Sequence, residues 1–128
     1  MIVVDTSVWV DYFRYPTSVV VAELQAKLDE DEVALVAPVR VELIGGAGRQ
    51  DVARLKRVLS ALPSWLPTGA TWATMESWAE KGGAREQRFG MGDLLIGAIA
   101  AEHDAKVWSF DADFARMERM GFVQLHRR

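Results

Sequence analysis

Four acidic residues stand out because the chain around them is strongly apolar, and a fifth closely follows one of them. Asp5 directly follows an apolar run at the N-terminus, and Asp111 follows another near the C-terminus. Asp93 begins an almost entirely apolar stretch, Glu42 has apolar neighbours on both sides, and Asp113 lies two residues after Asp111. In open parallel sheets, ligands bind beyond the carboxyl ends of the strands. Acids at strand ends and helix starts are therefore predicted to converge on one site.

Converging carboxylates need compensating positive charge, because a buried, unpaired charge costs roughly several kcal/mol. A divalent cation supplies that charge and accepts oxygen ligands. Mg²⁺ or Mn²⁺ suits best, since the sequence has no cysteine and its two histidines, His103 and His126, have no partner at metal-ligand spacing. We expect one or two Mg²⁺ or Mn²⁺ ions, bound directly or through water by Asp5, Glu42, Asp93 and Asp111.

Each acid also has an ordinary structural explanation. The two acids that follow apolar runs are typical turn residues. Asp93 fits a helix N-cap or a first-turn acid, and Glu42 fits a solvated helical stripe. Asp113 could form a surface ion pair with Arg116. Only the joint placement of the acids favours a metal site.

Other kinds of site have weaker support. The segment Gly45–Gly48 lacks the Lys-Ser/Thr that completes a phosphate-binding loop. No histidine is placed to activate a serine nucleophile. Three tryptophans could stack on bases, but aromatic residues at such intervals are typical of a core or an interface; these are Trp65, Trp72 and Trp78.

Short apolar runs that suit buried strands alternate with longer segments of helical period. Strands are predicted at residues 2–4, 32–37, 106–109 and 123–125, with a short extended piece at 65–66. Helices are predicted at residues 7–14, 19–28, 38–46, 50–62, 71–81, 93–103 and 112–120. The fifth of these helices is predicted to end at Gly82-Gly83. The alternation predicts an α/β fold whose mainly parallel sheet is covered on both faces.

Length and composition predict one domain over residues 1–128, with a core that needs no disulfide. No secretory signal and no membrane-spanning stretch are expected, which predicts a soluble, cytoplasmic protein. The net charge of −3 decides nothing about nucleic acid, because binding depends on where the charge lies. Four basic residues could hold phosphates beside an acidic site, although a solvated surface explains them equally well: Arg14, Lys81, Arg85 and Arg88.

Four segments in order resemble the PIN-domain family, and the short chain is similar to the VapC toxins of bacterial type II toxin–antitoxin systems. The segments are Asp5-Thr6-Ser7-Val8-Trp9, Glu42-Leu43 with its following glycines, Asp93-Leu94-Leu95-Ile96-Gly97-Ala98, and Ser109-Phe110-Asp111-Ala112-Asp113-Phe114. The resemblance spans nearly the whole chain. Gly97 stands where the family more often has alanine, which concerns helix packing and leaves the acids unchanged.

The resemblance implies a three-layer sandwich with a central, mainly parallel sheet. It also implies a metal-dependent endoribonuclease that uses Asp5, Glu42, Asp93 and Asp111, with Asp113 as a variable extra acid. Ser7 and Ser109 match supporting hydroxyl positions. The expected partners are RNA, a cognate antitoxin and a second copy of the chain. Two alternatives stay open, namely a PIN-like protein that binds RNA or a partner without cutting, and a receiver-type phosphoacceptor module.

Overall fold

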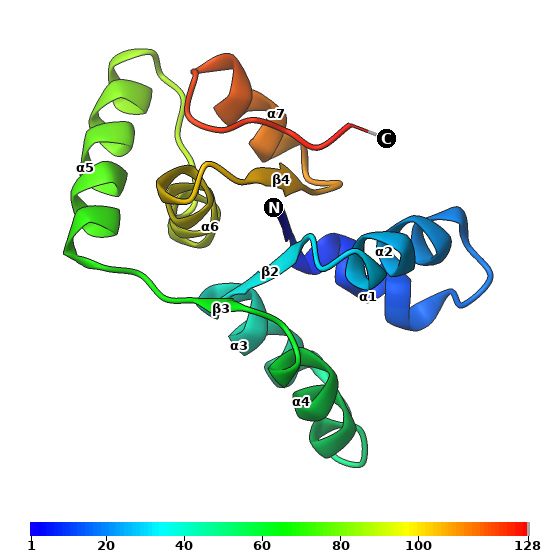
Figure 1. Cartoon of the computed structure of the whole chain (residues 1–128). Coiled ribbons are helices and arrows are strands. Elements are labelled where there is room, and N and C mark those ends of the chain that lie inside the picture. The colour runs from blue at the N-terminus through cyan, green and yellow to red at the C-terminus, as the bar shows by residue number, and fades with distance from the viewer. Residues whose placement is uncertain (128) are drawn as a thin grey trace.

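The computed structural model describes residues 1–127, so the predicted domain of residues 1–128 extends one residue beyond the described range. Within that range, four strands form one parallel sheet in the order β3-β2-β1-β4 (Figure 1). Their bounds are β1 Ile2–Val4, β2 Val33–Val36, β3 Ser64–Trp65 and β4 Lys106–Trp108. The long connections between parallel neighbours are helical, as such crossovers require.

Seven helices connect these strands within residues 1–127. They are α1 Thr6–Arg14, α2 Val19–Asp29, α3 Ala37–Gly46, α4 Val52–Ser60, α5 Gly69–Ala84, α6 Met91–Glu102 and α7 Ala112–Arg119. In Figure 1, α1 and α2 lie on one side of the sheet, and α6 lies on the other with α5 outside it. The predicted α/β sandwich with a central parallel sheet is confirmed.

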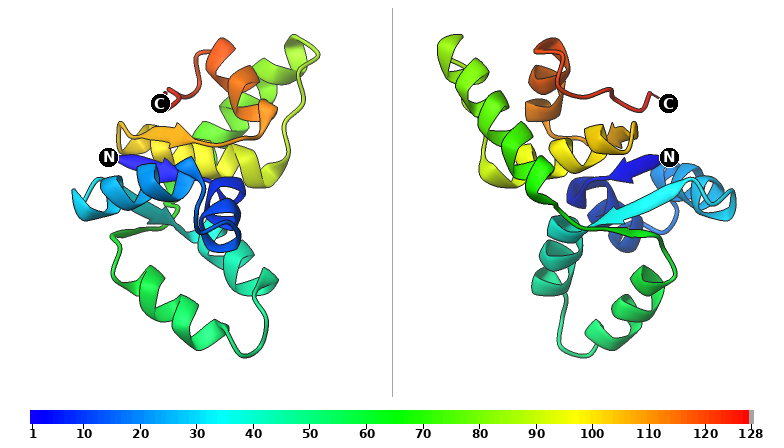
Figure 2. Two further views of the ribbon diagram at one scale, coloured as in Figure 1. Left: turned by 90° about the vertical axis from the view of Figure 1, so that its right-hand side faces the viewer. Right: turned by 60° about the vertical axis from the view of Figure 1, so that its left-hand side comes forward.

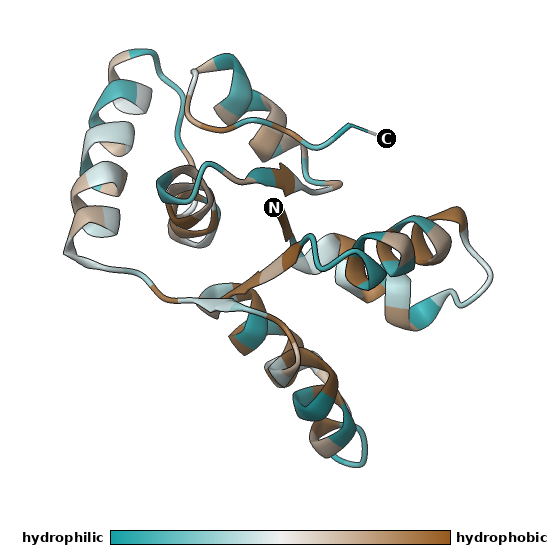
Figure 3. Cartoon of the chain, in the orientation of Figure 1, coloured by the Kyte–Doolittle hydropathy of each residue, from teal (hydrophilic) through white to brown (hydrophobic). Residues whose placement is uncertain are grey.

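The core lies between the sheet and its two helical layers. Every residue of β1 and β2 is buried, as expected for strands that helices cover on both faces. Figure 3 shows hydrophobic colour in β1, in much of β2 and in α6, whereas β3 is pale. The side chains of Trp9, Leu35, Ile99 and Phe114 are almost completely inaccessible to water. None of the helices in residues 1–127 combines the length and apolarity needed to cross a membrane.

Because the strands are parallel, their carboxyl ends meet at one edge of the sheet. In the left view of Figure 2, the arrows of β1 and β4 point toward this edge, and the chain that enters α6 descends beside it. The backbone N–H of Asp5 donates to the carbonyl of Trp108 at 2.9 Å, so the ends of the two strands are directly joined. The acids that follow these strands therefore start from adjacent positions.

The predicted last strand at residues 123–125 is wrong, because only an isolated bridge between Val107 and Leu125 forms there. Two backbone hydrogen bonds flank this bridge, from Val107 to Gln124 and from His126 to Val107. The preceding residue Val123 is buried in the core instead of alternating along a ladder. An apolar segment that follows a tight turn can thus resemble a strand in sequence, although its side chains mainly pack into the core.

The predicted end of a helix at Gly82-Gly83 is also wrong, because α5 continues to Ala84. A Cβ atom at Gly82 would lie 2.5 Å from the backbone oxygen of Gln87. The N–H of Gln87 donates to the carbonyl of Gly82 at 2.7 Å, so the chain folds back tightly over this glycine. Gly82 is needed for this close approach and not for breaking the helix.

Gly97 likewise permits close packing. A Cβ atom there would lie 2.6 Å from Met117 Cε and 3.1 Å from Val123 Cγ1. Met117 belongs to α7, so the missing side chain lets α6 and α7 approach each other. Both helices begin at the acidic edge of the sheet, and their packing therefore bears on the site.

Candidate metal centre

Asp5 is buried at the end of β1, with 7% of its surface exposed. Its Oδ2 accepts hydrogen bonds from Ser7 Oγ at 3.0 Å and from Ser109 Oγ at 2.7 Å. The two hydroxyls also accept backbone hydrogen bonds, Ser7 from Phe110 and Ser109 from Asp111. The serines therefore fix the orientation of the Asp5 carboxylate and tie the ends of β1 and β4 together.

Asp93, Asp111 and Asp113 form the tightest acidic group in residues 1–127. Each offers a carboxylate oxygen, and these oxygens lie within 4.8 Å of one another. Asp111 is the N-cap of α7, and its Oδ1 accepts from the N–H of Asp113 at 2.9 Å. Asp93 comes from the first turn of α6. Two helix starts from different parts of the chain thus bring the three carboxylates together.

The environment of Asp93 shows that negative charge accumulates here. Its pKa is raised from 3.8 to about 7, first by burial, then by the charges of Asp111 and Asp5 and by a hydrogen bond with Asp113. Near neutral pH, this carboxyl therefore holds a proton about half of the time when no cation is bound. A group of acids that cannot all ionise together is suited to binding a cation.

Three helices begin at the acidic edge and partly offset this charge. Asp5 is the N-cap of α1, Asp111 is the N-cap of α7, and Gly90 precedes the turn of α6 that carries Asp93. A helix N-terminus carries roughly half a positive elementary charge. These dipoles help to hold the acids together.

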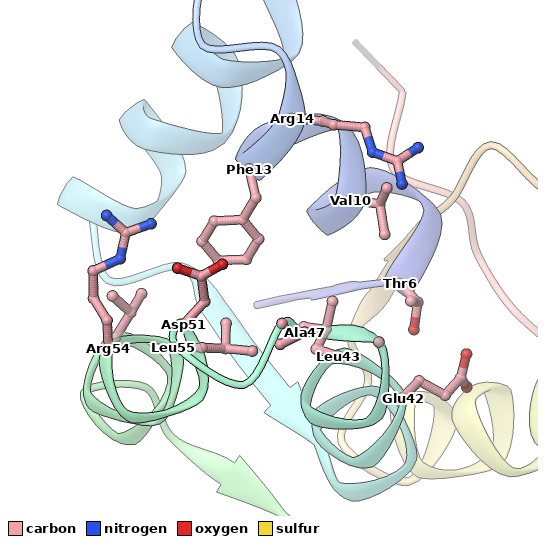
Figure 4. Close-up of a pocket in the computed structure, with 13 residues that line it drawn as sticks. Thr6, Val10, Phe13, Arg14, Glu42, Leu43, Ala47, Asp51, Arg54 and Leu55 are labelled. Atoms are coloured by element: carbon pink, nitrogen blue, oxygen red, sulfur yellow. The ribbon is translucent and has the colours of Figure 1, made fainter.

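Glu42 lies apart from the three clustered aspartates. It is exposed on α3, the helix that directly follows β2. Figure 4 shows its carboxylate projecting on the side of Thr6, the residue after Asp5. Thr6 was not predicted as a site residue, yet its buried Oγ1 has no hydrogen-bond partner within residues 1–127. Its position next to Asp5 is the one sequence signal that could have identified it.

The donor set fits a hard divalent cation. The clustered atoms are carboxylate oxygens, with hydroxyl groups behind them, and neither a thiolate nor an imidazole is among the three clustered residues. Mg²⁺ and Mn²⁺ prefer such oxygen ligands and commonly retain several waters.

A groove of about 480 Å³ begins beside Glu42 and runs between α1, α3 and α4. Its walls combine apolar residues, such as Phe13, Leu43 and Leu55, with charged residues. Figure 4 places the charged residue Glu42 at one end and Arg54 at the other. A groove with mixed walls thus extends to Glu42.

The predicted phosphate-binding residues have different positions. Arg14 lines the groove. Lys81 and Arg85 lie at the end of α5, which packs against α6. Arg88 lies in the segment before α6, where its carbonyl accepts from Arg116 at 3.1 Å. Arg88 is thus tied to α7, the helix that carries Asp113.

Trp78 is buried and stacks on Phe122, which agrees with the predicted core role. Trp65 stacks on His103 with ring centroids 3.9 Å apart. Trp72 is largely exposed on α5.

The model of the PIN domain family matches residues 2–120. Ribonuclease VapC11 of Mycobacterium tuberculosis is 31% identical over 129 aligned residues, which cover 97% of this chain and 96% of that protein.

Two solved structures share the fold. VapBC2 from Rickettsia felis, bound to a promoter DNA fragment, has a chain that matches with a TM-score of 0.81, 17% identity and 98% coverage of both chains. A chain of FitAcB from Neisseria gonorrhoeae matches with a TM-score of 0.78 and 21% identity, over 99% of this chain and 97% of that chain.

The receiver-type alternative gains no support from these matches. The family model extends from β1 to the end of α7 and so spans every predicted acid of the site. The chain therefore belongs to the PIN domain family, and its relatives there include VapC ribonucleases.

Proposed function

We propose that the protein is a metal-dependent endoribonuclease that hydrolyses RNA phosphodiester bonds at the acidic edge of its sheet. The observation that carries this proposal is the grouping of Asp93, Asp111 and Asp113, whose carboxylate oxygens lie within 4.8 Å of one another. The ribonuclease names of relatives at 31% identity support the reaction and the substrate class. The raised pKa of Asp93 supports a cation as the missing charge.

The proposed ligands are Asp5, Asp93, Asp111 and Asp113, with Glu42 acting through water. Mg²⁺ is the cation that we propose, with Mn²⁺ as its substitute. When bound, the cation supplies positive charge to the phosphate in the transition state and makes the attacking water easier to deprotonate.

The protein side chains orient and hold the reacting groups. Ser7 and Ser109 fix the Asp5 carboxylate through their hydrogen bonds. Glu42 lies on the groove side of the cluster, where it can orient water and accept a proton from it. The walls of the groove combine apolar residues, such as Val10, with charged residues, such as Arg14.

We propose that basic residues around the site hold the RNA backbone. Arg88 has the strongest support, because its carbonyl is tied to Arg116, which also binds Asp113. Arg85 precedes it by three residues at the end of α5. Lys81 on α5 and Arg14 in the groove would contact phosphates farther along the bound RNA. Each neutralised phosphate adds to the salt dependence of binding.

The test is incubation of the purified protein with total cellular RNA in millimolar Mg²⁺ or Mn²⁺, against the same reaction with chelator. We expect discrete cleavage products with metal, loss of cleavage with chelator, and recovery when excess Mn²⁺ is added. Cleavage that persists in chelator would contradict the metal role. Binding of RNA without cleavage in either metal would support the non-catalytic alternative.

We further propose that the protein is the toxin of a toxin–antitoxin pair and acts on RNA in the cytoplasm of the cell that makes it. The groove between α1, α3 and α4 would take a segment of the antitoxin that carries apolar side chains, because Phe13, Leu43 and Leu55 line it and it ends at Glu42. An occupant of this groove could thereby reach the acidic site and block it. The toxin–antitoxin complexes with the same fold support this partner class.

Phe13→Asp should weaken binding of the antitoxin by at least about tenfold, because it puts a charge on an apolar wall that the partner must cover. Tyr15→Asp is the matched control, since Tyr15 is a similarly exposed aromatic residue of the same region that does not line the groove. Co-expression with the product of a small neighbouring gene, followed by titration of the purified proteins, measures the difference. Equal affinity of both variants for the antitoxin would show that the antitoxin docks elsewhere on the protein.

We also propose a homodimer. Exposed apolar side chains on α3, α5 and α6 support it, namely Val41, Trp72 and Met91. Light scattering of the purified chain gives the mass directly, and a monomer at micromolar concentration would contradict the proposal.

A further inference from the structure

Arg116 of α7 makes an unusual number of specific contacts for a residue near the surface. Its Nη2 donates to Asp113 Oδ1 at 2.8 Å and to the carbonyl of Arg88 at 3.1 Å. Its Nη1 donates to Gln87 Oε1 at 2.8 Å, and its guanidinium lies 4.5 Å from the ring centroid of Phe89. Both terminal nitrogens and one face of the guanidinium are therefore engaged. A simple surface ion pair, which fixes a side chain weakly, does not have this arrangement.

One set of these contacts ends in the acidic cluster. Asp113 belongs to the group of three carboxylates, and it also hydrogen-bonds to Asp93. The hydrogen bond from Arg116 thus holds Asp113 on the side of the cluster where α7 begins.

The other set of contacts ends in the segment of residues 87–89. This segment leaves the close turn over Gly82 and leads into Gly90, the N-cap of α6. Asp93 follows in the first turn of that helix. By holding this segment, Arg116 restrains the start of α6 relative to the start of α7. The two helix starts carry Asp93, Asp111 and Asp113, so their relative position sets the spacing of the carboxylates.

We propose that Arg116 is a positioning residue of the metal site, which joins the entry of α6 to Asp113 and so keeps the carboxylates at the spacing that a divalent cation requires. It acts through Asp113 and the 87–89 segment and touches neither the cation nor RNA. This inference rests on the proposed metal site, but it does not depend on RNA being the substrate. A lysine cannot replace Arg116, because one ammonium group cannot reach all of these acceptors at once.

The experiment measures Mn²⁺ binding to the protein without RNA, by calorimetry, for wild type and Arg116→Lys. Loss of a residue that orients metal ligands typically weakens metal binding by about 10–100-fold, and we expect a loss in this range. Arg119→Lys is the matched control, since Arg119 is an exposed arginine of the same helix. Its Mn²⁺ affinity should equal that of wild type.

Cleavage kinetics on a short RNA distinguish positioning from direct contact with RNA. We expect Arg116→Lys to lower kcat at limiting Mn²⁺, to recover most of it at high Mn²⁺, and to leave KM for RNA unchanged. A raised KM with unchanged Mn²⁺ affinity would overturn the proposal and make Arg116 a phosphate-binding residue.

Gln87→Ala keeps the proposal testable if Arg116→Lys does not fold. It removes only the acceptor of the Arg116 Nη1 hydrogen bond. We expect Mn²⁺ binding to weaken by about threefold, a smaller loss in the same direction. Unchanged Mn²⁺ affinity in this folded variant would refute the positioning role. If wild type binds Mn²⁺ but cuts no RNA, the proposed function fails while the role of Arg116 is still decided.

Discussion

Asp93→Asn should lower metal-dependent RNA cleavage by at least about a thousandfold, because it removes a ligand where the cation stabilises the transition state. Asp93 is the acid on which burial and the charges of Asp111 and Asp5 act together. Asparagine keeps the size of the side chain and its place in the first turn of α6. The loss should therefore appear in cleavage assays while the circular dichroism spectrum stays unchanged.

The same variant should be more stable than wild type without metal. The raised pKa of Asp93 means that the fold favours its neutral form, so its contribution to stability is present at low pH and is lost as pH rises through about 7. At about pH 8 we expect Asp93→Asn to gain on the order of 2 kcal/mol, less than the pKa displacement alone implies because solvent screens a partly exposed carboxyl. At about pH 5 the gain should be small.

Asp104→Asn is the matched control for both measurements. Asp104 lies just beyond the other end of α6, is exposed, and has a positive φ of 52°, which asparagine tolerates well. The rate of RNA cleavage by Asp104→Asn and the melting temperature of this variant should match those of wild type. Full metal-dependent cleavage by Asp93→Asn would exclude Asp93 as a ligand.

The apparent affinity for Mg²⁺ should rise about tenfold for each pH unit from about pH 5 to 6.5 and level off above about 7.5. The reason is competition, because the proton on Asp93 must leave before the carboxylate can bind the cation. The pKa of about 7 sets this window. Calorimetry in two buffers of different ionisation enthalpy should find about one proton released per cation at about pH 6, and almost none well above pH 8.

Asp93→Asn serves again as the control. Its affinity for Mg²⁺ should be lower than that of wild type, and the rise of affinity with pH that the Asp93 proton causes should be absent. A wild-type affinity that does not change between about pH 5 and 7 would show that no proton of this pKa is displaced.

The strand ends were predictable because they rest on local patterns. An apolar run that ends in Asp5, and another that ends in Asp111, already place two acids at the carboxyl edge of a parallel sheet. Asp93 was predictable as the first polar position of an apolar helix, although α6 begins two residues earlier, at Met91. The supporting roles of Ser7 and Ser109 were predicted from the family resemblance. In the structure, both hydroxyls donate hydrogen bonds to Asp5.

The features that sequence did not predict depend on long-range geometry. Arg116 and Gln87 are 29 residues apart, and no periodicity links them. The sequence offered only the pairing of Arg116 with Asp113, three positions earlier, which is ordinary on a helix. Gly82 is a local exception: it resembled a helix end because residue types alone do not show that the Gln87 carbonyl folds back against it. The sequence predicted Glu42 as a metal ligand, but it did not show that Glu42 lies outside the group of three aspartates. That position depends on how α3 packs against the rest of the fold.

Diffraction from crystals soaked in millimolar Mn²⁺ is the sharpest test of the metal site, because anomalous scattering locates the ion independently of any activity. We expect a peak enclosed by Asp5, Asp93, Asp111 and Asp113, with carboxylate oxygens at about 2.0–2.3 Å. The peak should disappear in Asp93→Asn. A strong Mn²⁺ peak elsewhere, with none at these acids, would show that they do not form the metal site.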